Sequence, residues 1–242
     1  MTLDSYTCTN QGGRSYNEDY VGVKRTEKGA LYLLADGLGG HLHGEQASKG
    51  IVDFILGSGL PKEDEDRQVW LETVITASND HLLKLQQASN QKMKSTVVAL
   101  YIDGDQAVFA NVGDSRLYCL QNGKISGITE DHSVAYKKFK SGEITRDQIG
   151  SDEDQSCLLR CLGSPDHFLP DGYTLEGPLQ AGDGFLLCSD GMWEYLLDEE
   201  ILVDFLKADC AQTWAELLLL RAMDRFRPGN DNLSLITVMV RE

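Results

Sequence analysis

Several short stretches of the chain are rich in valine, isoleucine, leucine and tyrosine and are bounded by turn residues, which is typical of β-strands. This pattern predicts strands at 31–36, 95–102, 106–112, 115–121, 184–189 and 233–240. The strands at 95–102, 106–112 and 115–121 follow one another with short turns between them, so we expect an antiparallel meander. The triplet Asp103-Gly104-Asp105 and the pair Asn122-Gly123 favour hairpin turns.

Apolar residues spaced three and four positions apart predict helices at about 44–56, 68–90, 132–141, 198–207 and 211–225. The polar, glycine-bearing stretch 141–156 has little periodicity, and we expect a mobile excursion there. Long antiparallel β runs with helices at both ends, and no internal repeat, favour an α+β fold over alternating βαβ units. The prediction is one domain over residues 1–242.

Charge narrows the choice of partners. The 242 residues include 22 basic and 38 acidic ones, for a formal net charge of -16. A surface this negative repels phosphate backbones and anionic lipids, so nucleic acid and membranes are poor partners. No apolar run is long enough to span a bilayer, and the first ten residues lack the pattern of a secretion signal. The 6 scattered cysteines are expected to be reduced and mostly structural, in a cytoplasmic protein.

Acidic residues recur where apolar strands end. Asp36 follows the apolar run 30–35, and Asp190 follows 185–189. A single aspartate of this kind is well explained as a turn or cap residue. Several at converging strand ends would repel one another unless cations lay between them. The aspartates placed in this way are Asp19, Asp36, Asp114, Asp190 and Asp231.

The residues around Asp36 suit the same interpretation. Gly37, Gly39 and Gly40 allow either a sharp turn or a close approach of the backbone to a ligand. Carboxylates, a glycine carbonyl and water are hard oxygen donors, which suit magnesium, manganese or calcium rather than zinc.

Six short motifs occur in order between residues 14 and 238: R-S-Y-N-E-D, L-A-D-G-L-G-G-H, N-V-G-D-S-R, T-E-D-H-S, L-C-S-D-G and D-N-L-S. With these motifs the chain resembles the metal-dependent serine/threonine protein phosphatases of type 2C, in their bacterial form. The resemblance implies a four-layer αββα sandwich, in which two packed antiparallel sheets are flanked by helices. It also implies a flap beside the active site at about 134–165.

The resemblance further implies a core of two metal ions. Asp36, Asp190 and Asp231 match the ligands of the first ion. Asp36 and the Gly37 carbonyl match those of the second ion, helped by Glu18 directly or through water. The cofactors implied are Mn²⁺ or Mg²⁺.

Other positions match roles around this core. Arg14 matches an arginine that grips the substrate phosphate, because a planar guanidinium suits phosphate oxygens. Asp19 matches a residue that orients metal-bound water, and Asp114 matches a weaker third metal site. The catalytic residues implied are therefore Arg14, Asp19 and Asp36.

The implied reaction is hydrolysis of phosphoserine and phosphothreonine on proteins. Two ions would lower the pKa of a bridging water and hold the resulting hydroxide in line with phosphorus. The implied partners are phosphoproteins and a cognate serine/threonine kinase, and the chain is expected to act as a monomer. The alternative is an inactive relative that binds phosphoproteins. A nuclease is disfavoured by the acidic chain.

Two features depart from the family pattern. Leu38 stands where the eukaryotic branch has a histidine that could donate a proton, so water is the preferred donor. His41 and His43 are expected to serve helix entry or the surface. His132 lies between Asp131 and Ser133, which suit a helix start, so this motif is expected to be structural. Within the flap, the acidic stretch 150–156 replaces a basic family motif, which leaves substrate preference open and would disfavour strongly acidic substrates.

Overall fold

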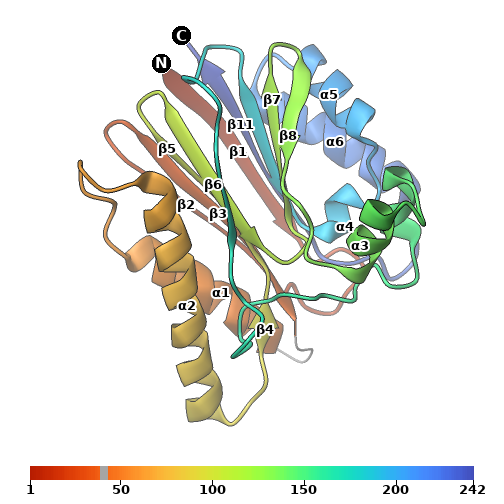
Figure 1. Ribbon diagram of the computed structural model, residues 1–242. Coiled ribbons are helices and arrows are strands. Elements are labelled where there is room, and N and C mark those ends of the chain that lie inside the picture. The colour runs from red at the N-terminus through yellow and green to blue at the C-terminus, as the bar shows by residue number, and fades with distance from the viewer. Residues whose placement is uncertain (39–42) are drawn as a thin grey trace.

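The computed structural model describes residues 1–38 and 43–242, and within them two antiparallel sheets pack face to face (Figure 1). One sheet has the order β1-β11-β10-β7-β8, and the other has the order β2-β3-β5-β6-β9 with β4 paired to β3. The strands are β1 (Thr2–Asn10), β2 (Asp19–Arg25), β3 (Gly29–Leu38), β4 (Lys94–Ser95), β5 (Val97–Asp103), β6 (Gln106–Val112), β7 (Arg116–Gln121), β8 (Lys124–Ile128), β9 (Asp171–Thr174), β10 (Gly184–Cys188) and β11 (Leu233–Arg241).

Helices cover the outer face of each sheet, which confirms the αββα arrangement (Figure 1). The sheet that contains β3 is covered by α1 (His43–Gly57) and α2 (Arg67–Ser89). The other sheet is covered by α3 (Val134–Ser141), α4 (Asp190–Trp193), α5 (Asp198–Lys207) and α6 (Ala211–Arg225). None of the helices described combines the length and apolar character needed to cross a bilayer.

The apolar run before Asp36 is buried on both faces of its strand. Residues of a strand point alternately to opposite sides. Ala30, Tyr32 and Leu34 therefore pack between the sheets, while the odd-numbered residues 31, 33 and 35 pack against α1 and α2. This double burial explains why the run is continuous rather than alternating.

The expected strands all overlap observed ones, but the expected meander is wrong in its third strand. β5 and β6 form the predicted hairpin around Gly104, whereas β7 crosses to the other sheet and pairs with β10 and β8. The crossing occurs at Gly113, whose φ is +103°. A Cβ at Gly113 would lie 2.6 Å from the Thr96 side chain, so only glycine fits this turn.

Other differences concern short or polar segments. The pattern did not predict β1, β2, β8 or β9, whose residues are mostly partly exposed and therefore lack long apolar runs. The stretch 141–156, expected to be a mobile excursion, contains the 3₁₀ helix η1 (Arg146–Ser151) with Ile149 buried. Lys138 also pairs with Asp152 at 2.9 Å, which ties this stretch to α3.

Candidate active site

The first two acidic residues of the candidate site meet across a pair of strands. Asp19 on β2 lies directly opposite Asp36 on β3 in the antiparallel register. The backbone of Asp36 is fixed by Thr96, whose Oγ1 accepts from the Asp36 N–H at 3.0 Å and whose N–H donates to the Asp36 carbonyl at 2.8 Å. The two carboxyl groups are therefore held at the same end of one sheet.

The other sheet brings two more carboxylates to this end. Asp190 begins α4, one residue after the end of β10, and Asp231 precedes the neighbouring strand β11. Gly191 N–H donates to Asp190 Oδ1 at 2.7 Å, and Arg14 Nη2 donates to Asp231 Oδ2 at 2.7 Å.

A hydrogen bond joins the ends of the two sheets. Ser189 Oγ, just before Asp190, donates to Asp19 Oδ2 at 2.9 Å. Through this contact, the strand ends that carry Asp19 and Asp36 meet those that carry Asp190 and Asp231.

Asp114 approaches the cluster from the crossing between β6 and β7. Its side chain is buried, and its carbonyl accepts a hydrogen bond from Trp193 Nε1 at 2.9 Å. Thr96 Oγ1 and Ser115 Oγ lie 2.7 Å apart, which links this turn to the segment that fixes Asp36.

The carboxyl groups influence one another's protonation. Burial, followed by the charges of Asp19, Asp190, Asp114 and Asp231, raises the pKa of Asp36 well above its ordinary value. Burial also raises the pKa of Asp19 to about 7 and raises the pKa values of Asp114 and Asp190. Such mutual repulsion in a desolvated place is relieved when cations share it.

Gly37 and Glu18 border the cluster beside Asp36. A Cβ at Gly37 would lie 2.0 Å from the Gly44 carbonyl oxygen, so the close packing of strand against helix requires glycine. Gly37 N–H donates to the Glu18 carbonyl at 3.0 Å, and Gly44 N–H donates to Glu18 Oε1 at 3.1 Å. Three residues discussed above, Gly39, Gly40 and His41, lie outside the described residues, whereas His43 begins α1.

The donor set fits a hard divalent ion. Asp19 Oδ1 is buried and finds no hydrogen-bond partner among the described residues. Within that same part of the chain, no group of three or more acidic, histidine or cysteine side chains already has the arrangement needed to hold a metal ion. Several of the carboxylate oxygens contact protein donors instead, as at Asp190 and Asp231. Oxygen donors near a surplus of negative charge nevertheless match the chemistry of Mg²⁺ or Mn²⁺.

Some supporting residues were not predicted from the sequence. Asn232 accepts from Glu18 N–H at 2.8 Å and donates to the Tyr16 carbonyl at 2.7 Å, so it fixes the loop that carries Arg14. The motif D-N-L-S contains this asparagine, but the motif alone does not reveal its clamping role. Gln155, in the stretch 141–156 that was expected to be a mobile excursion, donates to Asp190 Oδ2 at 3.2 Å.

The motif around His132 is structural in this fold. His132 is buried, its Nδ1 accepts from Gly113 N–H at 3.1 Å, and its Nε2 lies 2.9 Å from Asp171 Oδ2. Ser133 caps α3 by accepting from Tyr136 N–H, which is the helix-start role expected for this motif. Asp131, expected to share that role, instead forms an ion pair with Arg116.

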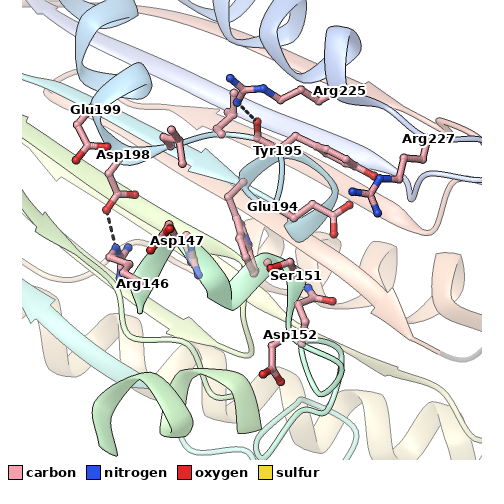
Figure 2. A pocket seen from close by; sticks show the side chains of 16 residues that line it. Arg146, Asp147, Ser151, Asp152, Glu194, Tyr195, Asp198, Glu199, Arg225 and Arg227 are labelled. Carbon is pink, nitrogen blue, oxygen red and sulfur yellow. Dashed lines mark hydrogen bonds and ion pairs between the residues drawn. The ribbon is translucent and has the colours of Figure 1, made fainter. Parts of the chain in front are cut away.

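A cleft of about 970 Å³ is lined in part by residues 193–199, which follow Asp190 closely in the chain (Figure 2). One wall is η1 and the segment after it, and the other is the connection between α4 and α5. Gln155 and Glu194 line the cleft, and burial with the nearby charge of Asp190 raises the pKa of Glu194 to about 7. Gln155 also donates to Asp190 at 3.2 Å, so one residue that lines the cleft contacts the carboxylate cluster.

Comparisons with known proteins agree with this geometry. A sequence profile for protein phosphatase 2C matches residues 10–219. The chain is 31% identical over 234 residues to the serine/threonine phosphatase stp of Listeria innocua, covering 93% of this chain and 90% of that protein. It superimposes on the crystal structure of the Mycobacterium tuberculosis serine/threonine phosphatase PstP/Ppp with a TM-score of 0.86, at 28% identity and 100% coverage of both chains. A crystal structure of the PstP catalytic domain in complex with 2 manganese ions matches with a TM-score of 0.83, at 27% identity and 99% coverage of both chains.

Proposed function

Because the chain belongs to the protein phosphatase 2C family, we propose that the carboxylates at the meeting point of its two sheets are the active centre of a serine/threonine protein phosphatase. The enzyme is a metal-dependent hydrolase that acts on phosphoproteins. The observation that carries the assignment of the centre is the contact from Ser189 to Asp19, which brings acidic residues of both sheets together.

The ions would be held by oxygen atoms of the strand ends. Asp36, Asp190 and Asp231 are proposed as ligands of one ion, and Asp36 with the Gly37 carbonyl and Glu18 as ligands of a second. When bound, such ions supply Lewis acidity toward water and toward the phosphoryl oxygens. The choice between Mn²⁺ and Mg²⁺ is part of the proposal, and manganese is supported by the relative that contains it.

Residues around the core orient the phosphate and water. Arg14 is 55% exposed in its side chain and pairs with Asp231, so its guanidinium can also donate to a phosphate oxygen of an incoming substrate. Asp19 Oδ1 has no hydrogen-bond partner among the described residues, so it is free to accept a hydrogen bond from water. Asp114 is proposed to hold a third, weaker ion, supported by its buried side chain at the turn that the Thr96–Ser115 contact links to Asp36.

The remaining proposals concern the surroundings of the enzyme. Residues 134–165 are proposed as a flap within one phosphatase domain of residues 1–242, supported by the contact from Gln155 to Asp190. A cognate serine/threonine kinase, a monomeric state and a cytoplasmic location are proposed as well. The location is supported by the free cysteines, of which Cys119, Cys161 and Cys188 are buried.

The test follows phosphate release from a phosphothreonine peptide and from p-nitrophenyl phosphate. Millimolar Mn²⁺ or Mg²⁺ should support turnover, and a chelator should abolish it, because oxygen ligands hold hard ions weakly enough to be stripped. Asp36→Asn should lower turnover by several orders of magnitude, while Asp64→Asn on an exposed loop should leave it unchanged.

The same assay addresses the alternative of an inactive phosphoprotein-binding relative. Such a protein would bind the phosphopeptide without releasing phosphate at any metal concentration. Full turnover by Asp36→Asn, or full turnover after dialysis against excess chelator, would contradict the proposed centre.

A further inference from the structure

The cleft beside the active centre is larger than the phosphate group requires. At about 970 Å³ it lies at the upper end of the range for ligand pockets, which is roughly 300–1,000 Å³. Its lining residue Gln155 contacts Asp190 at 3.2 Å, so the cleft begins one side chain away from the proposed centre. The space is therefore available to the polypeptide on one side of the phosphorylated residue.

An ion pair joins the two walls of the cleft at one end. Arg146 of η1 donates from Nε to Asp198 Oδ2 of α5 at 2.6 Å (Figure 2). Asp147 and Glu199 are the next residues on each wall, and both are exposed. The ion pair thus brings two further carboxylates to the same end of the cleft from opposite sides.

Most charges that line the cleft are already neutralised. Arg146, Arg225 and Asp152 have ion-pair partners, which are Asp198, Glu200 and Lys138 respectively.

The charges that are left favour one sign. Among the described residues, the lining carboxylates Asp147 and Glu199 form no ion pair, and Arg227 is the lining cation that forms none. Glu194 also forms no ion pair, but burial raises its pKa to about 7, so it carries only part of a negative charge near neutral pH. The chain as a whole carries a formal net charge of -16, which adds to the same negative potential.

From this charge distribution we propose that the cleft binds the polypeptide flanking the phosphorylated residue and selects substrates with lysine or arginine there. The inference rests on the proposed function of the adjacent centre. Asp147 and Glu199 are the specificity-determining residues, because they lie on opposite walls and have no basic partner in the described chain. Acidic flanking residues are repelled by the same pair of side chains.

The experiment compares phosphothreonine peptides of equal length that carry two arginines or two glutamates, placed on the N-terminal or the C-terminal side. The variant is Asp147→Lys with Glu199→Lys. The matched control is Glu63→Lys with Asp64→Lys, which makes the same change in net charge on the exposed loop between α1 and α2. For each protein we would measure kcat/KM in saturating Mn²⁺, peptide binding by fluorescence anisotropy, and turnover of p-nitrophenyl phosphate.

When the arginines lie on the side of the phosphothreonine that enters the cleft, the unmodified enzyme should prefer the arginine peptide by about tenfold in kcat/KM. This is the effect expected when the carboxylates of Asp147 and Glu199, on opposite walls, face a substrate cation. The cleft variant should bring the ratio close to one, while the loop variant should keep it. Turnover of p-nitrophenyl phosphate should be the same in all three proteins, because this ester has no polypeptide to enter the cleft.

Equal ratios in the cleft variant and the loop variant would overturn the proposal, as would the absence of any preference in the unmodified enzyme. Failure of the proposed function gives a different result, since neither peptide nor p-nitrophenyl phosphate would then be hydrolysed. In that case the anisotropy ratio still decides whether the cleft selects basic polypeptides.

Discussion

The ion pair between Arg116 and Asp131 lies beneath the active centre and allows a quantitative prediction of stability. Arg116 donates from Nε and Nη2 to the two carboxylate oxygens of Asp131 at 2.8 and 2.7 Å. The side chains are only 5% and 1% exposed. The guanidinium also lies 3.5 Å from the ring centroid of Trp193, whose Nε1 holds the Asp114 carbonyl. Loss of this pair should therefore affect both stability and the turn that carries Asp114.

Asp131→Asn removes the negative charge with almost no change in volume. It leaves the Arg116 guanidinium buried without its counter-ion, and breaking a buried pair in this way costs roughly 3–5 kcal/mol. The stacking on Trp193 and the 3.3 Å contact with the Tyr118 hydroxyl remain, so we expect a loss of about 3 kcal/mol in the free energy of unfolding.

The assay is equilibrium urea unfolding in chelator, so that ion binding does not add to the apparent stability. Glu130→Gln is the matched control, because its pair with Lys140 is about half exposed and should contribute less than about 1 kcal/mol. The double variant Arg116→Met with Asp131→Leu should recover most of the loss, since apolar residues of similar volume replace buried pairs well. If Asp131→Asn costs no more than Glu130→Gln, the reasoning is wrong.

Three further predictions concern single side chains. Arg14→Ala should raise the KM for a phosphopeptide by about tenfold with a smaller fall in kcat, because a phosphate-gripping arginine serves ground-state binding; unchanged kinetics would remove Arg14 from the site. Asp114→Ala should keep the core ions, as measured by calorimetry, but lose most activity on phosphopeptides; loss of all ion binding would place Asp114 in the core. The Arg225 guanidinium lowers the pKa of Glu200 to about 2. Its contribution to stability is therefore present above pH 4.5 and lost as the pH falls toward 2. Glu200→Gln should cost about 1–2 kcal/mol at pH 7 and nothing near pH 2 in urea unfolding; an equal cost at both pH values would contradict this reasoning.

Local features of the chain were predictable because their physical causes are local. The helices at 198–207 and 211–225 coincide with α5 and α6, since each presents an apolar face at helical spacing. The hairpin turn at Asn122-Gly123 has positive φ at both residues, as its sequence demands. The aspartates at strand ends were visible for the same reason, because a charge that interrupts an apolar run marks the end of a buried strand.

The pairing of strands was decided only in three dimensions. β7 is apolar on both faces, so its sequence fits next to β6 or next to β10 equally well. Its actual place depends on Gly113, whose positive φ and close contact with Thr96 turn the chain toward the other sheet. A glycine in sequence does not reveal which direction such a turn takes.

For the proposed active centre, too, some features follow from the sequence and others only from the tertiary structure. Sequence alone predicted the acidic residues of the proposed centre and their oxygen chemistry, which depend on residue type and on neighbours along the chain. The register that sets Asp19 opposite Asp36, the clamp formed by Asn232 and the ion pair between Arg146 and Asp198 join residues far apart in sequence. These contacts depend on how two sheets and a flanking segment pack together, and only the tertiary structure contains that information.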